Sequence, residues 1–233
     1  MIISQYDKPY LHTLIQYNKT LVQRNALLKE QSRNHSLFDV LEMQLAMYGN
    51  TIFEKRQQLI EQLTPYFNEY YQTISRSNEQ VELRYISQLT DMESPEQTLK
   101  QSREYDSVLG YTSKGVHKDD IEMTLGSKLI RRVGSQGQSK TYLIALKLAQ
   151  LAFMSTHAPT KPILLLDDIF DKLDADRVEE IIKLVGNDSF GQIFITDTNR
   201  KYLDQILLAM PSDYTLYKIE QGGSTPLEKA AEA

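Results

Sequence analysis

The sequence predicts an α/β fold, in which a mainly parallel sheet flanked by helices follows a separate α-helical arm. Two observations support this class. Two short apolar runs, residues 163–166 and 192–196, are separated by a helical pattern, and the whole has the length of one right-handed β-α-β crossover. Ahead of them, apolar residues recur at helical spacing over most of residues 6–74.

The arm is expected to contain two long helices. The first covers residues 6–30, because its apolar residues recur at spacings of three, four and seven. Ser36 and Asp39 open the second. Thr64 and Pro65 are expected to break it, since Thr at an N-cap and Pro at the first helical position begin a new helix. The aromatic residues that follow keep helical spacing, so we assign them to the core rather than to base stacking: Tyr66, Phe67, Tyr70 and Tyr71.

A strand and a helix are expected at the end of the arm. Residues 81–86 alternate apolar and polar side chains, as a half-exposed strand does. Ser94 then starts a helix that Gly110 closes. We therefore divide the chain into a helical arm, residues 1–110, and a second domain, residues 111–233.

The second domain opens with the segment Gly115-Val116-His117-Lys118-Asp119-Asp120, which leads into another alternating strand over residues 121–125. A histidine beside two acidic residues suggests a metal site. Adjacent residues of an extended chain point to opposite faces, however, and rarely converge on one ion. We therefore expect these side chains to make structural hydrogen bonds.

A polar turn, Gly134–Thr141, precedes an apolar run from Tyr142 to Phe153. Ser135, with Gln138 three residues later, has the capping-box pattern of a helix start. Free backbone N–H groups and the helix dipole at such a start favour an anion, and Gly137 lets a ligand approach the backbone. The alternative is an ordinary helix cap that binds no phosphate.

Two carboxylates, Asp167 and Asp168, follow the apolar run that begins at Pro162. Four consecutive branched apolar residues predict a buried strand of a parallel sheet, and ligands bind at the carboxyl ends of such strands. Asp167 is suited to hold Mg²⁺, which prefers hard oxygen ligands. Asp168 could polarise an attacking water. The alternative is that the two acids cap the next helix.

The remaining elements complete the crossover and add a final strand. A helix is expected over residues 176–185, a buried strand over residues 192–196 and a further helix over residues 200–209. Residues 214–219 predict a last strand. From Gln221 onward the composition suggests a loose tail.

Composition places the chain among globular proteins without disulfides. Hydrophobic residues make up 41% and charged residues 24%, there is no Cys, and no apolar run reaches the length of a membrane span. We therefore expect a cytoplasmic protein with no membrane partner. The net charge of −5 argues against a strong general DNA binder, which would carry a basic surplus.

The motifs also resemble a known family. Ser135-Gln136-Gly137-Gln138 before a helix, then Ile163 to Asp168, then Leu173-Asp174, are similar to the signature motif, Walker B and D-loop of the ATP-binding-cassette (ABC) ATPases. The variant resembles RecF, the DNA-repair branch, more than it resembles transporters. Further similar segments, at residues 17–29, 115–120 and 145–149, spread the resemblance over most of the chain.

The resemblance implies that the second domain is part of an ABC-type ATPase head that uses ATP and Mg²⁺. Asp167 would bind Mg²⁺, Asp168 would orient the attacking water and Asp174 would lie in the D-loop. The signature residues would contact the nucleotide of a second copy across a dimer: Ser135, Gln136, Gly137 and Gln138. The switch region falls at Thr196 and Asp197, and which of them acts as the switch residue stays open. The alternative is that this segment is a plain helix N-cap.

The resemblance also implies partners. A full-length relative is expected to form an ATP-dependent homodimer, to bind gapped or double-stranded DNA and to act with other recombination mediators. No Gly-x-x-x-x-Gly-Lys-Ser/Thr loop occurs in the sequence, although this Walker A loop holds the phosphates in the family. In RecF that loop lies near the N-terminus. The chain is thus expected to be the C-terminal part of a RecF, and alone to bind or hydrolyse no ATP.

Two alternatives stay open at this point. The chain could act without catalysis, as a fragment that docks a repair partner through its helical arm. It could also be half of another ABC-type or SMC-like ATPase, although the arm lacks the sustained heptads of a long coiled coil.

Overall fold

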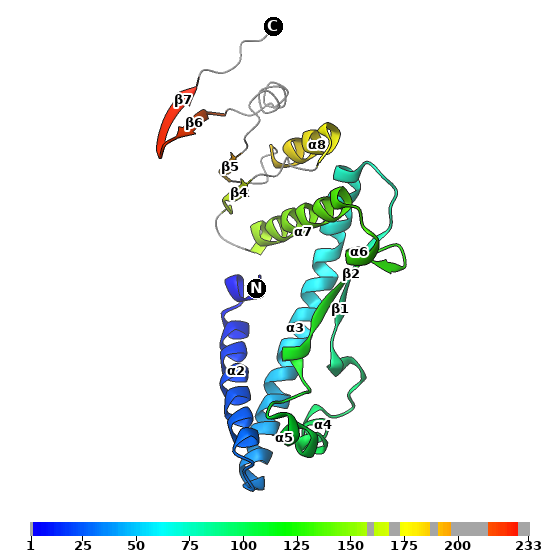
Figure 1. The fold of residues 1–233 in the computed structure, drawn as a ribbon, viewed down its shortest axis with the longest axis vertical. Helices are drawn as coiled ribbons and strands as arrows, with labels where there is room; N and C mark the ends of the chain where they lie inside the picture. The colour runs from blue at the N-terminus through cyan, green and yellow to red at the C-terminus, as the bar shows by residue number, and fades with distance from the viewer. Residues whose placement is uncertain (1, 158–160, 168–172, 187–190, 197–213, 228–233) are drawn as a thin grey trace. The chain divides into compact units, whose positions relative to one another are not determined.

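The computed structural model describes residues 2–157, 161–167, 173–186, 191–196 and 214–227. Two compact units divide the chain: the first comprises Met1–Pro65 and Gln80–Ile130, and the second Tyr66–Glu79 and Arg131–Ala233. Each unit combines helices and strands (Figure 1), so the predicted α/β class is confirmed. The predicted division of the full protein at residue 110 stays a prediction.

Helices dominate the first unit. They are α1 (Ile3–Tyr6), α2 (Lys8–Lys29), α3 (His35–Ser75, of which the residues up to Pro65 belong here), α4 (Pro95–Gln101) and α5 (Arg103–Leu109). The Asp7 carboxylate caps α2 by accepting from the Tyr10 amide at 2.8 Å. Ser94 caps α4, and Gly110 ends α5 in the left-handed conformation with φ +74°. The long helix predicted near residues 6–30 is confirmed as α2.

The predicted break at Thr64 and Pro65 is wrong, because α3 continues through Pro65. Proline in a helix interior removes one hydrogen bond and costs roughly 3 kcal/mol. Glu61, whose carbonyl loses its partner, and Pro65 are both exposed, so water can reach that carbonyl. The Thr64 hydroxyl donates to the Ile60 carbonyl at 2.7 Å instead of capping a new helix. Burial of Leu63 and Phe67 on either side offsets the loss.

The start of α3 also differs from the prediction. Ser36 and Asp39 do not open the helix. The Asn34 side chain does so, by accepting from the Leu37 amide at 3.1 Å and from the Ser36 hydroxyl at 2.9 Å. Asn and Ser are similarly good caps, so the local sequence allows either.

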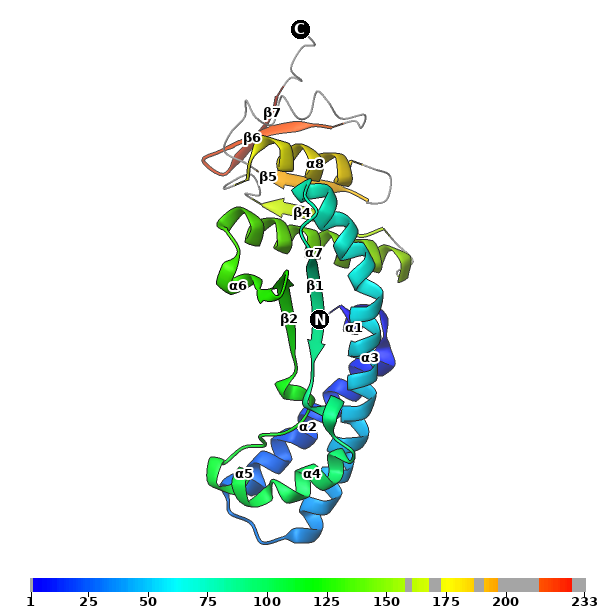
Figure 2. The ribbon, with the colours of Figure 1, turned by 90° about the vertical axis from the view of Figure 1, so that its right-hand side faces the viewer.

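The strands of the first unit form an antiparallel sheet in the order β1 (Val81–Ile86), β2 (Asp120–Leu125) and β3 (Lys128–Leu129). Figure 2 shows β1 and β2 side by side. In their antiparallel register Leu83 pairs with Met123. Two short 3₁₀ turns, η1 (Gln88–Asp91) and η2 (Val116–Lys118), lie between β1 and β2 in the sequence. The predicted strands at residues 81–86 and 121–125 are confirmed.

The second unit contains the last part of α3, α7 (Gln136–His157) and α8 (Ala175–Val185), after the short α6 (Ile130–Val133) at the division. Strands β4 (Leu164–Asp167) and β5 (Ile193–Thr196) pair in parallel. They are the parallel part of the predicted sheet, whereas β6 (Leu216–Glu220) and β7 (Gly223–Leu227) pair antiparallel. None of the helices within the described ranges is long and apolar enough to cross a bilayer.

An aromatic cluster joins α3 to α7 within the second unit. The rings of Phe67 and Tyr142 lie 4.6 Å apart, and those of Tyr71 and Tyr142 lie 5.7 Å apart. All three side chains are buried. Such pairs add to the burial of apolar area, so α7 is firmly attached to the last turns of α3. The assignment of Phe67 and Tyr71 to the core is confirmed.

The predicted loose tail is wrong where the structure describes it. Gln221 and Gly222 both have positive φ, at 49° and 79°. Two such residues form the tight turn of a β-hairpin, and Glu220 accordingly pairs with Gly223. The helix predicted over residues 200–209 lies outside the described residues.

Candidate functional site

The start of α7 is the best-defined part of the candidate site. The Ser135 hydroxyl oxygen accepts from the Gln138 amide at 3.1 Å, and the Gln138 side-chain oxygen accepts from the Ser135 amide at 2.8 Å. The predicted capping box is therefore confirmed as a structure. The predicted role of this helix start as a nucleotide contact stays a prediction.

Within the described residues, this capping pattern leaves several donors unused. The Ser135 oxygen accepts a bond through a lone pair, so its own hydrogen can still be donated. The amides of Gln136 and Gly137 occupy the first helical positions, where no intrahelical carbonyl faces them. Ser135 and Gln136 are exposed. The geometry can thus present one hydroxyl and two amides to an anion, in the direction that the helix dipole favours.

Glu79 supports this helix start from the end of α3, and no pattern in the sequence marks it. Its carboxylate accepts from the Gln138 side-chain amide at 2.6 Å and from the Tyr71 hydroxyl at 2.7 Å. These bonds, first that of Tyr71 and then that of Gln138, lower the pKa of Glu79. Glu79 is therefore a charged acceptor at neutral pH.

The carboxyl end of the parallel pair brings two predicted residues together. Asp167 on β4 and Thr196 on β5 are register partners, and the Thr196 hydroxyl donates to Asp167 Oδ1. Both residues are exposed. Among the described residues, the other oxygen of Asp167 has no partner and lies beside a hydroxyl oxygen, and these are the hard ligands that Mg²⁺ prefers. In the described part of the chain, no three acidic, His or Cys side chains gather into a metal site.

The other predicted residues of this region divide into two groups. Asp168 and Asp197 lie outside the described residues. Asp174 is the N-cap of α8, where its carboxylate accepts from the Arg177 amide at 2.9 Å and lies 3.4 Å from the Arg177 guanidinium. The structure therefore gives Asp174 a capping role, and its predicted place in a D-loop stays a prediction.

Arg76 connects the end of α3 to α8. Its guanidinium lies 2.7 Å from Glu180 and 3.5 Å from Asp176, and its backbone has a left-handed φ of 48°. Arg76 and Glu79 are three positions apart. The short segment after α3 therefore contacts α8 through Arg76 and the start of α7 through Glu79.

The histidine segment of the first unit makes structural hydrogen bonds, as expected. His117 Nε2 lies 2.9 Å from the Thr112 carbonyl, which can only accept, so this nitrogen carries the proton. Nδ1 then accepts from the Tyr17 hydroxyl at 2.8 Å. Burial lowers the pKa of His117, which keeps the ring neutral. Gly115 is required beside it, because a Cβ there would lie 2.6 Å from the Tyr17 hydroxyl.

Asp119 of the same segment is nearly buried. One of its oxygens accepts from Arg56 at 2.7 Å and from the Tyr85 hydroxyl, while the other has no hydrogen-bond partner among the described residues. The Arg56 guanidinium also donates to the Val116 carbonyl at 2.7 Å. These bonds hold the segment against α3.

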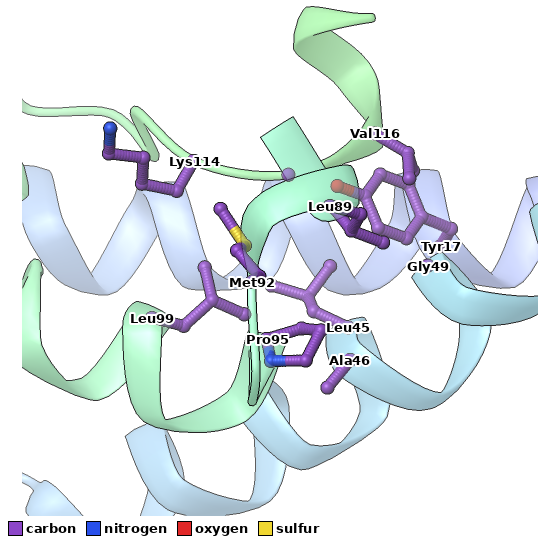
Figure 3. Close-up of a pocket in the computed structure, with 11 residues that line it drawn as sticks. Tyr17, Leu45, Ala46, Gly49, Leu89, Met92, Pro95, Leu99, Lys114 and Val116 are labelled. Carbon is purple, nitrogen blue, oxygen red and sulfur yellow. The ribbon is translucent and has the colours of Figure 1, made fainter. Parts of the chain in front are cut away.

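A pocket in the first unit lies close to this segment. Figure 3 shows its mainly apolar lining, which comes from Tyr17, Leu45, Gly49, Leu89, Met92, Pro95 and Val116 among others, with the Lys114 ammonium directed away from it. Its volume is about 10 Å³, which leaves room for a single water at most. The pocket is thus a packing defect of the core and no ligand site.

Comparison with known proteins identifies the family. No family model matches the chain. The chain is 67% identical over 229 residues to the DNA replication and repair protein RecF of Parabacteroides distasonis, covering 98% of the chain and 62% of that relative. It is 52% identical over 230 residues to RecF of Bacteroides fragilis strain YCH46, with the same coverage.

Solved structures of RecF proteins also resemble the chain. The chain superposes with a TM-score of 0.78 and 30% identity on a structure of the recombination mediator protein RecF-ATP in the RecFOR pathway, over 97% of the chain and 61% of that protein. A second structure, RecF-ATPrS, gives a TM-score of 0.77. The chain spans about three fifths of the length of the relatives it matches. The likeness that was inferred from the signature, Walker B and D-loop segments is confirmed: the chain belongs to the RecF family.

Proposed function

We propose that this chain is part of a DNA repair and recombination ATPase that dimerises on ATP and binds gapped or double-stranded DNA to promote recombinase loading. The observation that carries the proposal is the 67% identity to a RecF over 98% of the chain. The phosphate-binding loop is expected on a segment outside this sequence, so the chain alone is expected neither to bind nor to hydrolyse ATP.

Asp167 is the proposed Mg²⁺ ligand. It ends a parallel strand, is exposed, and keeps one oxygen free of the Thr196 hydroxyl. Mg²⁺ supplies neutralisation of the charge on phosphate oxygens. Thr196 would hold the Asp167 carboxylate in one orientation. Asp168 would orient the attacking water, and Thr196 or Asp197 would sense the γ-phosphate.

Ser135 and Gly137 are proposed to contact a nucleotide held by a second copy. The exposed hydroxyl of Ser135 and the amides of Gln136 and Gly137 would donate to γ-phosphate oxygens across the dimer. A nucleotide that contacts both copies binds the dimer more tightly than the monomer, so ATP favours dimerisation by mass action. Asp174, at the start of α8, is proposed to lie near the same interface.

The rest of the proposal concerns organisation and partners. Residues 1–110 would form the arm of the full-length protein and residues 111–233 part of its ATPase head. The net charge of −5 gives no general attraction to DNA. We propose, from the likeness to RecF, that the ATP-dependent dimer binds DNA and that other recombination mediators assist it.

The test is the variant Ser135→Arg in the full-length protein that contains this sequence. A long cationic side chain at the helix start would block the approach of a second copy but leave the other nucleotide contacts in place. We expect loss of ATP-driven dimerisation in sedimentation velocity, with nucleotide binding retained.

The matched control is Gln72→Arg, which adds the same side chain at an exposed position of α3. This control should dimerise normally. Dimerisation of Ser135→Arg at the wild-type ATP concentration would contradict the proposed role of this helix start.

A further inference from the structure

We infer that Glu79 is a positioning residue for the helix start that carries Ser135, and that it acts through the side chain of Gln138. The inference rests on the proposed function, because it takes this helix start to be the nucleotide contact between two copies. Glu79 itself follows α3 and would touch neither the nucleotide nor Mg²⁺.

The first step is the orientation of the Gln138 amide. A carboxylate can only accept hydrogen bonds, so the NH₂ group of Gln138 must face Glu79, at 2.6 Å. The oxygen of the same amide then faces the Ser135 N–H, at 2.8 Å. Glu79 thus selects the one amide orientation that completes the capping box.

The second step is the orientation of Glu79. Its other carboxylate oxygen accepts from the Tyr71 hydroxyl at 2.7 Å. Tyr71 is fully buried, and its ring packs against Tyr142 of α7. Gln138 and Tyr142 are one helical turn apart and lie on the same face of α7. Glu79 and Tyr71 therefore fix α7 at two successive turns, and the Tyr71 hydroxyl fixes the Glu79 carboxylate.

The third step is the consequence of losing Glu79. Without the carboxylate, the Gln138 amide can rotate and turn its NH₂ group toward the Ser135 N–H, where two donors face each other. The capping box would open, and the loop before α7 would sample other positions. Because the contact across a dimer requires the Ser135 hydroxyl and the neighbouring amides in one arrangement, dimerisation would weaken while the fold remained.

The experiment compares Glu79→Ala, Gln138→Ala and the double variant in the full-length protein. ATP-driven dimerisation is measured by sedimentation velocity, and nucleotide affinity of the monomer by a fluorescent ATP analogue. We expect Glu79→Ala to weaken dimerisation about tenfold, the effect of one lost hydrogen bond to a charged group, with unchanged nucleotide affinity. In the Gln138→Ala background the same change should have no further effect.

Three further variants make the result specific. Glu69→Ala removes an exposed glutamate of α3, the helix that precedes Glu79, and should behave as wild type. Glu79→Gln keeps an oxygen that can accept from Gln138 and should restore most of the dimerisation. Tyr71→Phe removes only the hydroxyl that donates to Glu79, and we expect a smaller weakening of dimerisation. If Glu79→Ala fails to fold, Tyr71→Phe provides the test of the inference.

The outcomes separate the inference from the proposed function. Normal dimerisation of Glu79→Ala would overturn the inference, and so would additive effects of Glu79→Ala and Gln138→Ala. If Glu79→Ala does not fold, normal dimerisation of Tyr71→Phe would overturn it. If Ser135→Arg also dimerises normally, the proposed role of this helix start as the contact between two copies fails. If Ser135→Arg abolishes dimerisation while Glu79→Ala does not, only the role of Glu79 is wrong.

Discussion

Two arginines of this chain each meet several carboxylates, but their surroundings differ. Arg24 on α2 is fully buried and donates to Glu42 at 3.1 Å, to Asp106 at 2.7 Å and to the Leu99 carbonyl at 3.0 Å. The side chain of Arg76, after α3, is 45% exposed, and its guanidinium nitrogens lie 2.7 to 3.8 Å from the oxygens of its carboxylate partners.

The difference shows what an ion pair does in each place. Around Arg24 no water can replace a lost partner, so every group of the cluster depends on the others. Around Arg76 water and salt compete with each pair, so its contacts position α8 without holding the fold. Arg56, whose side chain is 18% exposed, lies between the two extremes. Substitution should therefore cost the most stability at Arg24, less at Arg56 and least at Arg76.

Arg24→Met should have the largest effect. It leaves Glu42 and Asp106 without their buried cation, although Arg103 still lies within 3.0 Å of Glu42. Breaking a buried pair from one side costs about 3–5 kcal/mol. We expect a decrease of that size in the free energy of unfolding, measured by urea denaturation with far-ultraviolet circular dichroism.

Lys19→Met is the control, since it changes an exposed cation on the same helix. If Arg24→Met were no less stable than this control, the buried cluster would contribute nothing to the fold.

Arg56→Met should have an intermediate effect. The change removes bonds to the Asp119 carboxylate and the Val116 carbonyl, each 2.7 Å long, and leaves Asp119, which is 3% exposed, with the Tyr85 hydroxyl as its donor. An unsatisfied buried acceptor of this kind costs about 2–3 kcal/mol. The same denaturation measurement checks it.

Arg56→Lys refines this test. A lysine keeps the charge but cannot reproduce the forked geometry of a guanidinium. We expect it to recover part of the loss, and full recovery would mean that the charge alone matters at this position.

The sequence could predict the elements whose signals are local. The capping box of Ser135 and Gln138 joins residues three positions apart, and the alternation that predicts β1 lies within the strand itself. The parallel pairing was also predictable, because two uninterrupted apolar runs at crossover spacing are typical of neighbouring parallel strands. The predicted burial of both strands is wrong in part, since Leu165 of β4 and Phe194 of β5 are exposed. The meeting of Asp167 and Thr196 then follows from the topology alone.

Contacts between distant residues could not be predicted in this way. The side chains that Arg24 binds lie 18, 82 and 88 positions away, and an arginine at that place in an amphipathic pattern is typical of a solvated surface. Glu79 and Gln138 are 59 positions apart, and nothing near Glu79 marks it as a partner of a helix start. Pro65 misled the prediction for a related reason, since packing on both sides of it outweighs a strong local signal.

Arg76→Gln should have the smallest effect of the series. Glutamine keeps the Cβ in the same left-handed backbone conformation, so the variant changes only the charge and its pairs with Glu180, Asp176 and Glu179. Because these carboxylates remain in contact with water, we expect the urea midpoint to stay within the error of the measurement, and any small difference to vanish when salt is raised. A loss as large as that of Arg56→Met would contradict the comparison, and would mean that the turn carrying Arg76 and Glu79 holds α8 in place as well as the start of α7.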